Sequence, residues 1–168
     1  RYFYDNNTAY SKKPSKGDVT KVRVGQTSCG GSWADTRYLY DDWGNSKIVT
    51  DTLGHMITTT YDTTAGVWPM LYALPTSVIA PLVGTTTYAW DKVLGQVTSV
   101  TDPNLATTSY SYDQWGRQTA VIKPGDDATN PTLRFSYTNY VGPPSPYWVK
   151  QEQKESGSNY LESRTFYD

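Results

Sequence analysis

The stretch YDDWGNSKIVTDTLGHMITTTYD, from Tyr40 to Asp62, decides how the whole chain is interpreted. An aromatic–Asp pair is followed by Gly, by a run rich in β-branched residues, by a second Asp-x-x-Gly, and by a run that closes on Tyr-Asp. The same order recurs in WDKVLGQVTSVTDPNLATTSYSYD, from Trp90 to Asp113, and YDQWGR opens a further copy at Tyr112. The sequence therefore contains an internal repeat of about 21 residues.

Each repeat predicts strands joined by tight turns. Asp starts a turn by accepting backbone N–H bonds, and Gly supplies the positive φ that L-residues resist. Thr, Val, Ile and Tyr dominate between the turns, as strands prefer. No helical periodicity with capping signals stands out. We therefore expect an all-β fold in which consecutive antiparallel β-hairpins form a meander.

The runs between turn signals give the expected strands. These cover about residues 19–24, 36–41, 46–50, 55–61, 85–90, 96–101, 106–112, 117–123 and 132–138, and a closing hairpin is formed by YWVKQEQKES and NYLESRTFYD. Residues 25–35 predict a Gly/Ser loop. Residues 63–84 contain three prolines, which exclude one long helix. There we expect a short helical turn near 70–74, a strand at 76–80, and a segment that covers a sheet face.

We expect residues 1–168 to be one domain and an excerpt from a longer chain. Its repeats occupy about residues 1–24, 36–62, 85–123 and 132–168, with insertions at about 6–16, 25–35, 63–84 and 139–146. The apolar residues are largely aromatic, with 15 Tyr and 6 Trp against 3 Phe. Because Tyr and Trp combine a flat apolar body with a polar tip, this composition suits half-exposed sheet faces.

Charge and composition argue against several classes of partner. The chain has 15 Lys and Arg against 16 Asp and Glu, without a basic cluster, so a nucleic-acid surface is not expected. No apolar run approaches the length of about 20 residues that spans a bilayer. Cys29 is the single cysteine, which excludes an internal disulfide and a cysteine-based zinc site.

The sequence offers no set of residues for catalysis, a cofactor or a metal. His55 is the sole histidine, and it follows a turn glycine, where a solvated strand residue is the simplest interpretation. The regularly spaced aspartates are explained by turn formation. Asp126 and Asp127 are adjacent but lie in an exposed loop, which does not favour the paired carboxylates of a glycosidase. No Gly-rich phosphate loop joins a strand to a helix.

The repeated residues resemble the YD-repeat, or Rhs-repeat, family, with the pattern YDxxGRLTxVTDxxGxxTxYxYDxxGR. Residues 40–62 and 90–117 follow this pattern closely, and residues 1–22 and 163–168 follow it in part. The residues that match it form the expected structural motif: Tyr40, Asp41, Gly44, Asp51, Gly54, Tyr61, Asp62, Trp90, Asp91, Gly95, Asp102, Tyr112, Asp113 and Gly116.

This resemblance implies a curved, spiralling sheet that forms part of a hollow shell. Such shells occur in bacterial Rhs and insecticidal toxin-complex proteins, where they enclose a toxic domain, and in the teneurins. It therefore implies a non-enzymatic, encapsulating segment of a secreted or cell-surface protein, whose partners are neighbouring repeats and an enclosed toxin domain. Rhs proteins also release their toxin by Asp-Pro chemistry, but Asp102-Pro103 lacks the Gly-rich continuation and is interpreted as a turn.

Two further expectations concern binding. Exposed aromatic side chains could stack on sugar rings, which makes a carbohydrate- or cell-surface-binding module the alternative function, with possible glycan contacts at Trp33, Trp43, Trp68, Trp115 and Trp148. The same rings could instead pack across neighbouring hairpins. Strands at the two ends of such an excerpt are expected to be unpaired edges, so the chain could self-associate through Arg1–Asp5 or Tyr160–Asp168.

Overall fold

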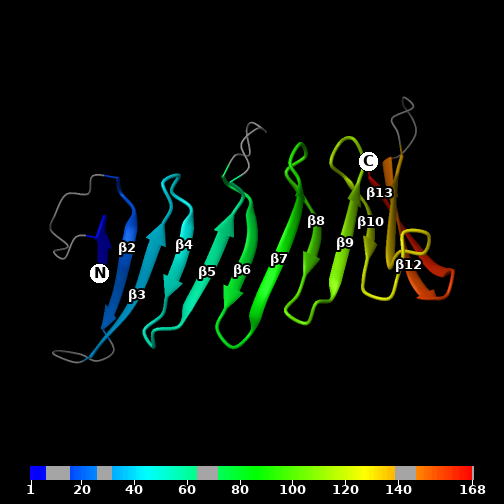
Figure 1. The fold of residues 1–168 in the computed structure, drawn as a ribbon. Helices are drawn as coiled ribbons and strands as arrows, with labels where there is room; N and C mark the ends of the chain where they lie inside the picture. The colour runs from blue at the N-terminus through cyan, green and yellow to red at the C-terminus, as the bar shows by residue number, and fades with distance from the viewer. Residues whose placement is uncertain (7–15, 26–31, 64–71, 139–146, 168) are drawn as a thin grey trace. The chain divides into compact units, whose positions relative to one another are not determined.

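The computed structural model describes residues 1–6, 16–25, 32–63, 72–138 and 147–167. These residues form one 13-stranded sheet and contain no helix (Figure 1). The strands lie in the sheet in the order in which they occur in the chain, so every connection joins neighbours. Each pairing with a defined register is antiparallel, for example β4 with β5 and β12 with β13. The predicted all-β fold of consecutive antiparallel hairpins is confirmed.

The strands belong to two compact units. The first, Arg1–Thr87, holds β1 (Tyr2–Tyr4), β2 (Val19–Gly25), β3 (Trp33–Tyr40), β4 (Ser46–Thr50), β5 (Met56–Tyr61) and β6 (Pro75–Ala80). The second, Tyr88–Asp168, holds β8 (Gln96–Thr101), β9 (Thr107–Tyr112), β10 (Gln118–Ile122), β11 (Leu133–Tyr137), β12 (Tyr147–Ser156) and β13 (Asn159–Tyr167). Strand β7 (Gly84–Asp91) crosses the boundary between the units.

Strand β3 begins earlier than the sequence predicts. Trp33 to Asp35 were expected in the Gly/Ser loop, but they pair with the end of β2, where Trp33 lies opposite Gly25. The guanidinium of Arg23 holds both carboxylate oxygens of Asp35 at 2.6 Å across the two strands. This charged pair extends the hairpin by three residues beyond the apolar pattern. Residues 26–31, with Cys29, lie outside the described residues.

The proline-rich segment differs in part from its prediction. The strand expected at 76–80 is present as β6, which pairs with β5 on one side and β7 on the other. Residues 72–74 form a turn rather than a helical turn, and residues 64–71 lie outside the described residues. The described part of the segment thus enters the sheet instead of covering its face. Pro75 and Pro81 are compatible with this because they lie at the start of β6 and just after it.

The sheet keeps few side chains fully out of water. Among the described residues, the buried apolar ones are Phe3, Leu74, Val121 and Pro131, and no polar residue is buried as a whole. Such a sheet gains its stability from hydrogen bonds, cross-strand pairs and partly covered rings rather than from one dry core.

One turn carries a leucine where its counterparts carry glycine. Gly44, Gly54 and Gly116 have φ values of 88°, 88° and 76°, and no atom lies within 4 Å of where a Cβ would be. Leu105 holds the corresponding place after Asp102, with φ of 66° and a side chain that is 84% exposed. A left-handed backbone costs an L-residue about 1–2 kcal/mol. The glycines are therefore required by backbone conformation and not by lack of space.

Reciprocal substitutions test this requirement. Leu105→Gly should raise the free energy of unfolding by up to about 1 kcal/mol, because relief of the left-handed strain exceeds the added flexibility of the unfolded chain. Gly54→Ala should lower it by about 1 kcal/mol or more, although the methyl group has room. Urea unfolding of both variants measures the two changes. Effects of the same sign would contradict the explanation.

Candidate functional site

The candidate site is the turn that follows the aromatic–Asp pair, and Asp41 shows its geometry. Oδ1 of Asp41 accepts hydrogen bonds from the backbone N–H of Trp43 at 3.0 Å and of Asn45 at 2.8 Å. Its own N–H donates to the carbonyl of Asn45 at 2.9 Å, and the N–H of Gly44 donates back to the Asp41 carbonyl at 3.2 Å. One carboxylate thus satisfies the donors that the turn directs inward.

The same arrangement recurs at other sequence-predicted aspartates. Oδ1 of Asp51, Asp102 and Asp113 each accepts the backbone N–H groups two and four residues later, at 2.8–3.0 Å. Asp91 begins a different turn, in which Oδ1 accepts the N–H groups two and three residues later, and the N–H of Gly95 donates to the Asp91 carbonyl. These positions were predicted from the sequence as turn residues.

Longer insertions enter at this same turn without changing how it closes. Asp5 donates its N–H to the carbonyl of Asp18 at 2.9 Å, and its carboxylate accepts the N–H groups of Lys16, Gly17 and Asp18. Asp62 likewise donates its N–H to the carbonyl of Leu74 at 2.9 Å. The backbone bond that closes the turn is therefore the same whether or not an insertion follows the aspartate.

Sequence reasoning missed a further turn of this kind at Thr138. Its N–H donates to the carbonyl of Trp148 at 3.1 Å, and its Oγ1 accepts the N–H of Trp148 at 2.9 Å. A threonine hydroxyl here takes the part that the Asp carboxylate takes elsewhere. The signal that could have revealed it is Tyr137 immediately before, in the position of the repeat tyrosine.

The tyrosine before the turn ties each hairpin to the strand before it. The phenol of Tyr112, at the end of β9, donates to the carbonyl of Val97 in β8 at 2.9 Å. Corresponding bonds run from Tyr40 to Val19, from Tyr61 to Ser46 and from Tyr137 to Gln118. Burial raises the pKa of all four phenols, which keeps them protonated as donors. Trp90 occupies this place at the end of β7, where it has no hydroxyl to donate.

A second contact to the carboxylate comes from the side chain four residues after the aspartate. Nδ2 of Asn45 donates to Asp41, Nδ1 of His55 lies 2.8 Å from Asp51, and Nε of Arg117 lies 2.6 Å from Asp113. His55 therefore contacts the turn carboxylate, whereas its sequence position predicted only a solvated strand residue. The physical reason is that the closing bond of the turn places this side chain over Oδ2.

These contacts set the pKa values of the aspartates. The His55 ring is the main cause that holds the pKa of Asp51 below its ordinary value of 3.8. Partial burial raises the pKa of Asp41 and of Asp113, but hydrogen bonds from Asn45 and Arg117 and from the turn backbone outweigh it, so both lie below 3.8.

The tryptophans proposed for glycan contact are distributed over separate turns and strands. Trp33, Trp115 and Trp148 each have a guanidinium within 6 Å of the ring centroid, from Arg1, Arg117 and Arg164 respectively. Trp43 stacks on Tyr72 with centroids 3.9 Å apart and planes inclined by 10°. Trp68 lies outside the described residues. Trp33 and Trp43 belong to the first unit, and Trp115 and Trp148 belong to the second.

The Trp43–Tyr72 stack forms the wall of a hollow in the first unit. The hollow has a volume of 430 Å³ and is lined by Ile48, Thr58, Thr60 and Lys47, among others. Tyr72 is held there by its carbonyl, which accepts a hydrogen bond from Asn45. Trp43 remains 59% exposed, so one side of its ring is accessible.

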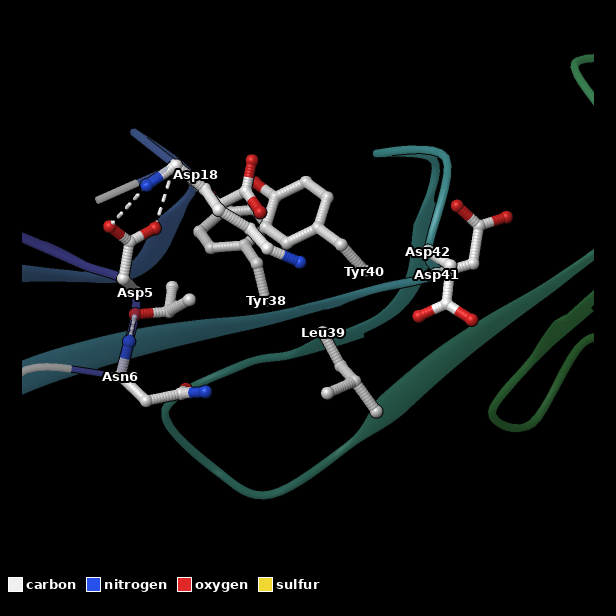
Figure 2. A pocket seen from close by; sticks show the side chains of 10 residues that line it. Asp5, Asn6, Asp18, Tyr38, Leu39, Tyr40, Asp41 and Asp42 are labelled. Atoms are coloured by element: carbon white, nitrogen blue, oxygen red, sulfur yellow. Dashed lines mark hydrogen bonds between the residues drawn. The ribbon is translucent and has the colours of Figure 1, made fainter. Parts of the chain in front are cut away.

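A second hollow in the same unit, of 300 Å³, is polar and lies between the Asp5 and Asp41 turns (Figure 2). Figure 2 shows the rings of Tyr38 and Tyr40 beside Asp18. The carboxylates of Asp5 and Asp41 already accept backbone N–H bonds. This hollow is therefore explained by the two turns that border it.

Two kinds of feature are absent from the described residues. Within them, no group of three or more His, Cys, Asp or Glu side chains is placed to hold a metal ion. In the same part of the chain, no helix is long and apolar enough to cross a membrane.

The lowered pKa values predict how stability depends on pH. The folded state holds Asp41, Asp51 and Asp113 ionised at lower pH than the unfolded state does. Their contribution to the free energy of unfolding should therefore be complete above about pH 5 and be lost as the pH falls below about 4. Urea unfolding of the wild type and of Asp113→Asn from pH 7 to pH 3 tests this. The variant should lose less stability on acidification, and an identical loss would contradict the assignment.

Comparison with known proteins is consistent with this geometry. The family described as RHS Repeat matches residues 93–128, which contain the turns at Asp102 and Asp113 and the phenol of Tyr112. No curated protein matches the chain. Among solved structures, one chain of "Crystal Structure of TcdB2-TccC3-Cdc42" is similar, with a TM-score of 0.48 and 15% identity; the match covers 74% of this chain and 6% of that chain. The predicted resemblance to the Rhs-repeat, or YD-repeat, family is thus confirmed over residues 93–128.

Proposed function

We propose that this chain is a structural segment of a larger shell, which encloses cargo and does no chemistry in the segment itself. The observation that carries the proposal is the use made of the repeat's polar residues. The carboxylates of Asp41, Asp51, Asp102 and Asp113 accept backbone N–H bonds, and the repeat tyrosines donate to backbone carbonyls. Side chains engaged with the backbone in this way specify geometry and not reactivity.

The construction of the sheet supports the same role. Each strand pairs with its neighbours in the chain, so the sheet grows by adding one hairpin after another. Repeat arrays of this kind gain stability from nearest-neighbour interfaces, and they extend without needing a closed core. The family resemblance supplies the remainder of the proposal: a secreted or cell-surface polypeptide, neighbouring repeats as partners, and an enclosed toxin domain as cargo.

Limited proteolysis of the complete polypeptide tests the encapsulating role. In the wild type, the enclosed cargo, which is a segment outside the repeats, should resist protease because the shell surrounds it. Gly54→Val should expose that segment, because it disturbs a left-handed turn of the wall. Leu53→Ser alters a 79% exposed side chain in the same turn and should leave protection unchanged. Mass spectrometry identifies the cleaved sites. Equal cleavage of this cargo segment in the wild type and in both variants would refute encapsulation.

A glycan-binding role is a second candidate, and the hollow beside Trp43 favours it. Its volume of 430 Å³ suits a small ligand, and it combines an accessible indole face with threonines and with Lys47. The apolar face of a pyranose ring could stack on the indole while its hydroxyls bond to the polar residues.

Tryptophan fluorescence tests this second role. Titration with cell-wall polysaccharides should quench the emission of the wild type and of Trp115→Phe, whose ring lies on a separate turn beside Arg117. Trp43→Phe should lose most of the quenching while keeping its unfolding midpoint within a few degrees. Flat titrations with several polysaccharides would eliminate the glycan role.

A further inference from the structure

One face of the first unit gathers basic side chains on β2 and β3. Lys21 lies directly opposite Arg37 in the β2–β3 register, and Arg23 lies opposite Asp35. Residues two positions apart in a strand share a face, so these four side chains lie on one side of the sheet. β2 lies between β1 and β3, and β3 lies between β2 and β4. The basic residues therefore occupy strands that have a paired neighbour on each side.

Contacts between the side chains agree with this shared face. Nζ of Lys21 lies 3.9 Å from the centroid of the Phe3 ring, and the guanidinium of Arg23 lies 5.7 Å from the same centroid. The hydrogen bond from Arg23 is the main cause that lowers the pKa of Asp35, and the charges of Lys21 and Arg37 lower it further. All three cations thus surround one carboxylate.

The charges of this basic patch, which consists of Lys21, Arg23, Asp35 and Arg37, are not balanced within it. Lys21 and Arg37 face each other across the two strands, and such like-charged pairs are unfavourable in an antiparallel sheet. Both oxygens of Asp35 are already held by Arg23 at 2.6 Å. Three cations against one carboxylate leave a net charge of +2. The stability of the hairpin therefore does not account for Lys21 and Arg37.

The spacing of the cations fits an extended acidic peptide. Lys21 and Arg23 are two residues apart in β2, so their Cα atoms are about 6.7 Å apart. Carboxylates at every second residue of an extended peptide recur at the same interval. Leu39 follows Arg37 on this face, is 50% exposed and offers an apolar contact beside the charges. Figure 2 shows Leu39 on the other side of β3 from the two tyrosines that flank it.

We propose that the basic patch docks an extended acidic segment of a partner protein, in which carboxylates alternate with uncharged residues. A short segment with two or three carboxylates matches the net charge of +2. A long polyanion such as a nucleic acid fits less well, because Asp41 and Asp42 directly follow β3 and would repel further phosphates. The proposal does not depend on whether the chain encloses cargo.

A synthetic peptide tests the proposal on the full 168-residue chain. A fluorescein-labelled peptide of alternating glutamate and threonine should bind at low ionic strength, and its anisotropy gives the dissociation constant. Lys21→Gln and Arg37→Gln should each weaken binding about three- to fivefold, because each removes one exposed charge contact. Lys123→Gln removes the same charge from an exposed residue of the second unit and should leave binding unchanged. A peptide with glutamine in place of glutamate should not bind.

The variants allow folding and binding to be separated. Lys21→Gln and Arg37→Gln each relieve a like-charged pair, so neither should lower the midpoint of thermal unfolding, which circular dichroism measures. Absence of peptide binding, or equal weakening by Lys123→Gln, would overturn the proposal. Tighter binding of single-stranded DNA or of polygalacturonate than of the glutamate peptide, with the same dependence on Lys21 and Arg37, would overturn it in favour of a nucleic acid or an acidic polysaccharide.

Discussion

The constraint on which this structure depends is the closing of a turn by a single carboxylate. Asp41 shows it most fully: one oxygen accepts two backbone N–H groups, and the backbone N–H of the aspartate closes the ring four residues later. A tight turn inevitably directs backbone donors inward, and an unpaired donor that is shielded from water costs free energy comparable to a lost hydrogen bond. The aspartate supplies the missing acceptor within its own turn. Each hairpin therefore closes from local residues, without help from a distant core.

The tyrosine before the aspartate provides the complementary link between hairpins. Turns alone would define hairpins that could separate, because the sheet has very little buried apolar surface. The phenols of Tyr40, Tyr61, Tyr112 and Tyr137 each reach a carbonyl in the preceding strand. In the motif, the tyrosine that links two strands is followed directly by the aspartate that closes the next turn. This explains why a two-residue signature can organise a sheet of this size.

The repeat also accepts inserted residues at one position, directly after the turn aspartate. The insertion after Asp5 and the one after Asp62 are both closed by the same N–H to carbonyl bond that closes a four-residue turn. The bond that closes the base of each insertion is therefore the same as in an uninterrupted turn. Loops that extend from a rigid sheet are where binding residues usually occur, and Tyr72, which forms the wall of the hollow with Trp43, comes directly from such a loop. The same scaffold can thus acquire surface features without a change in its strands.

The sequence by itself determined the all-β class, the meander and most strand positions, because Asp, Gly and β-branched residues act over a few positions along the chain. It correctly predicted β8 at 96–101 and both strands of the closing hairpin. Only the tertiary structure decided which distant groups meet. The Arg23–Asp35 pair lengthens β3, and the hydroxyl of Thr138 replaces a carboxylate. It also decided which charges face each other across β12 and β13. These outcomes depend on register between strands, and register is set by cross-strand contacts that a local pattern does not contain.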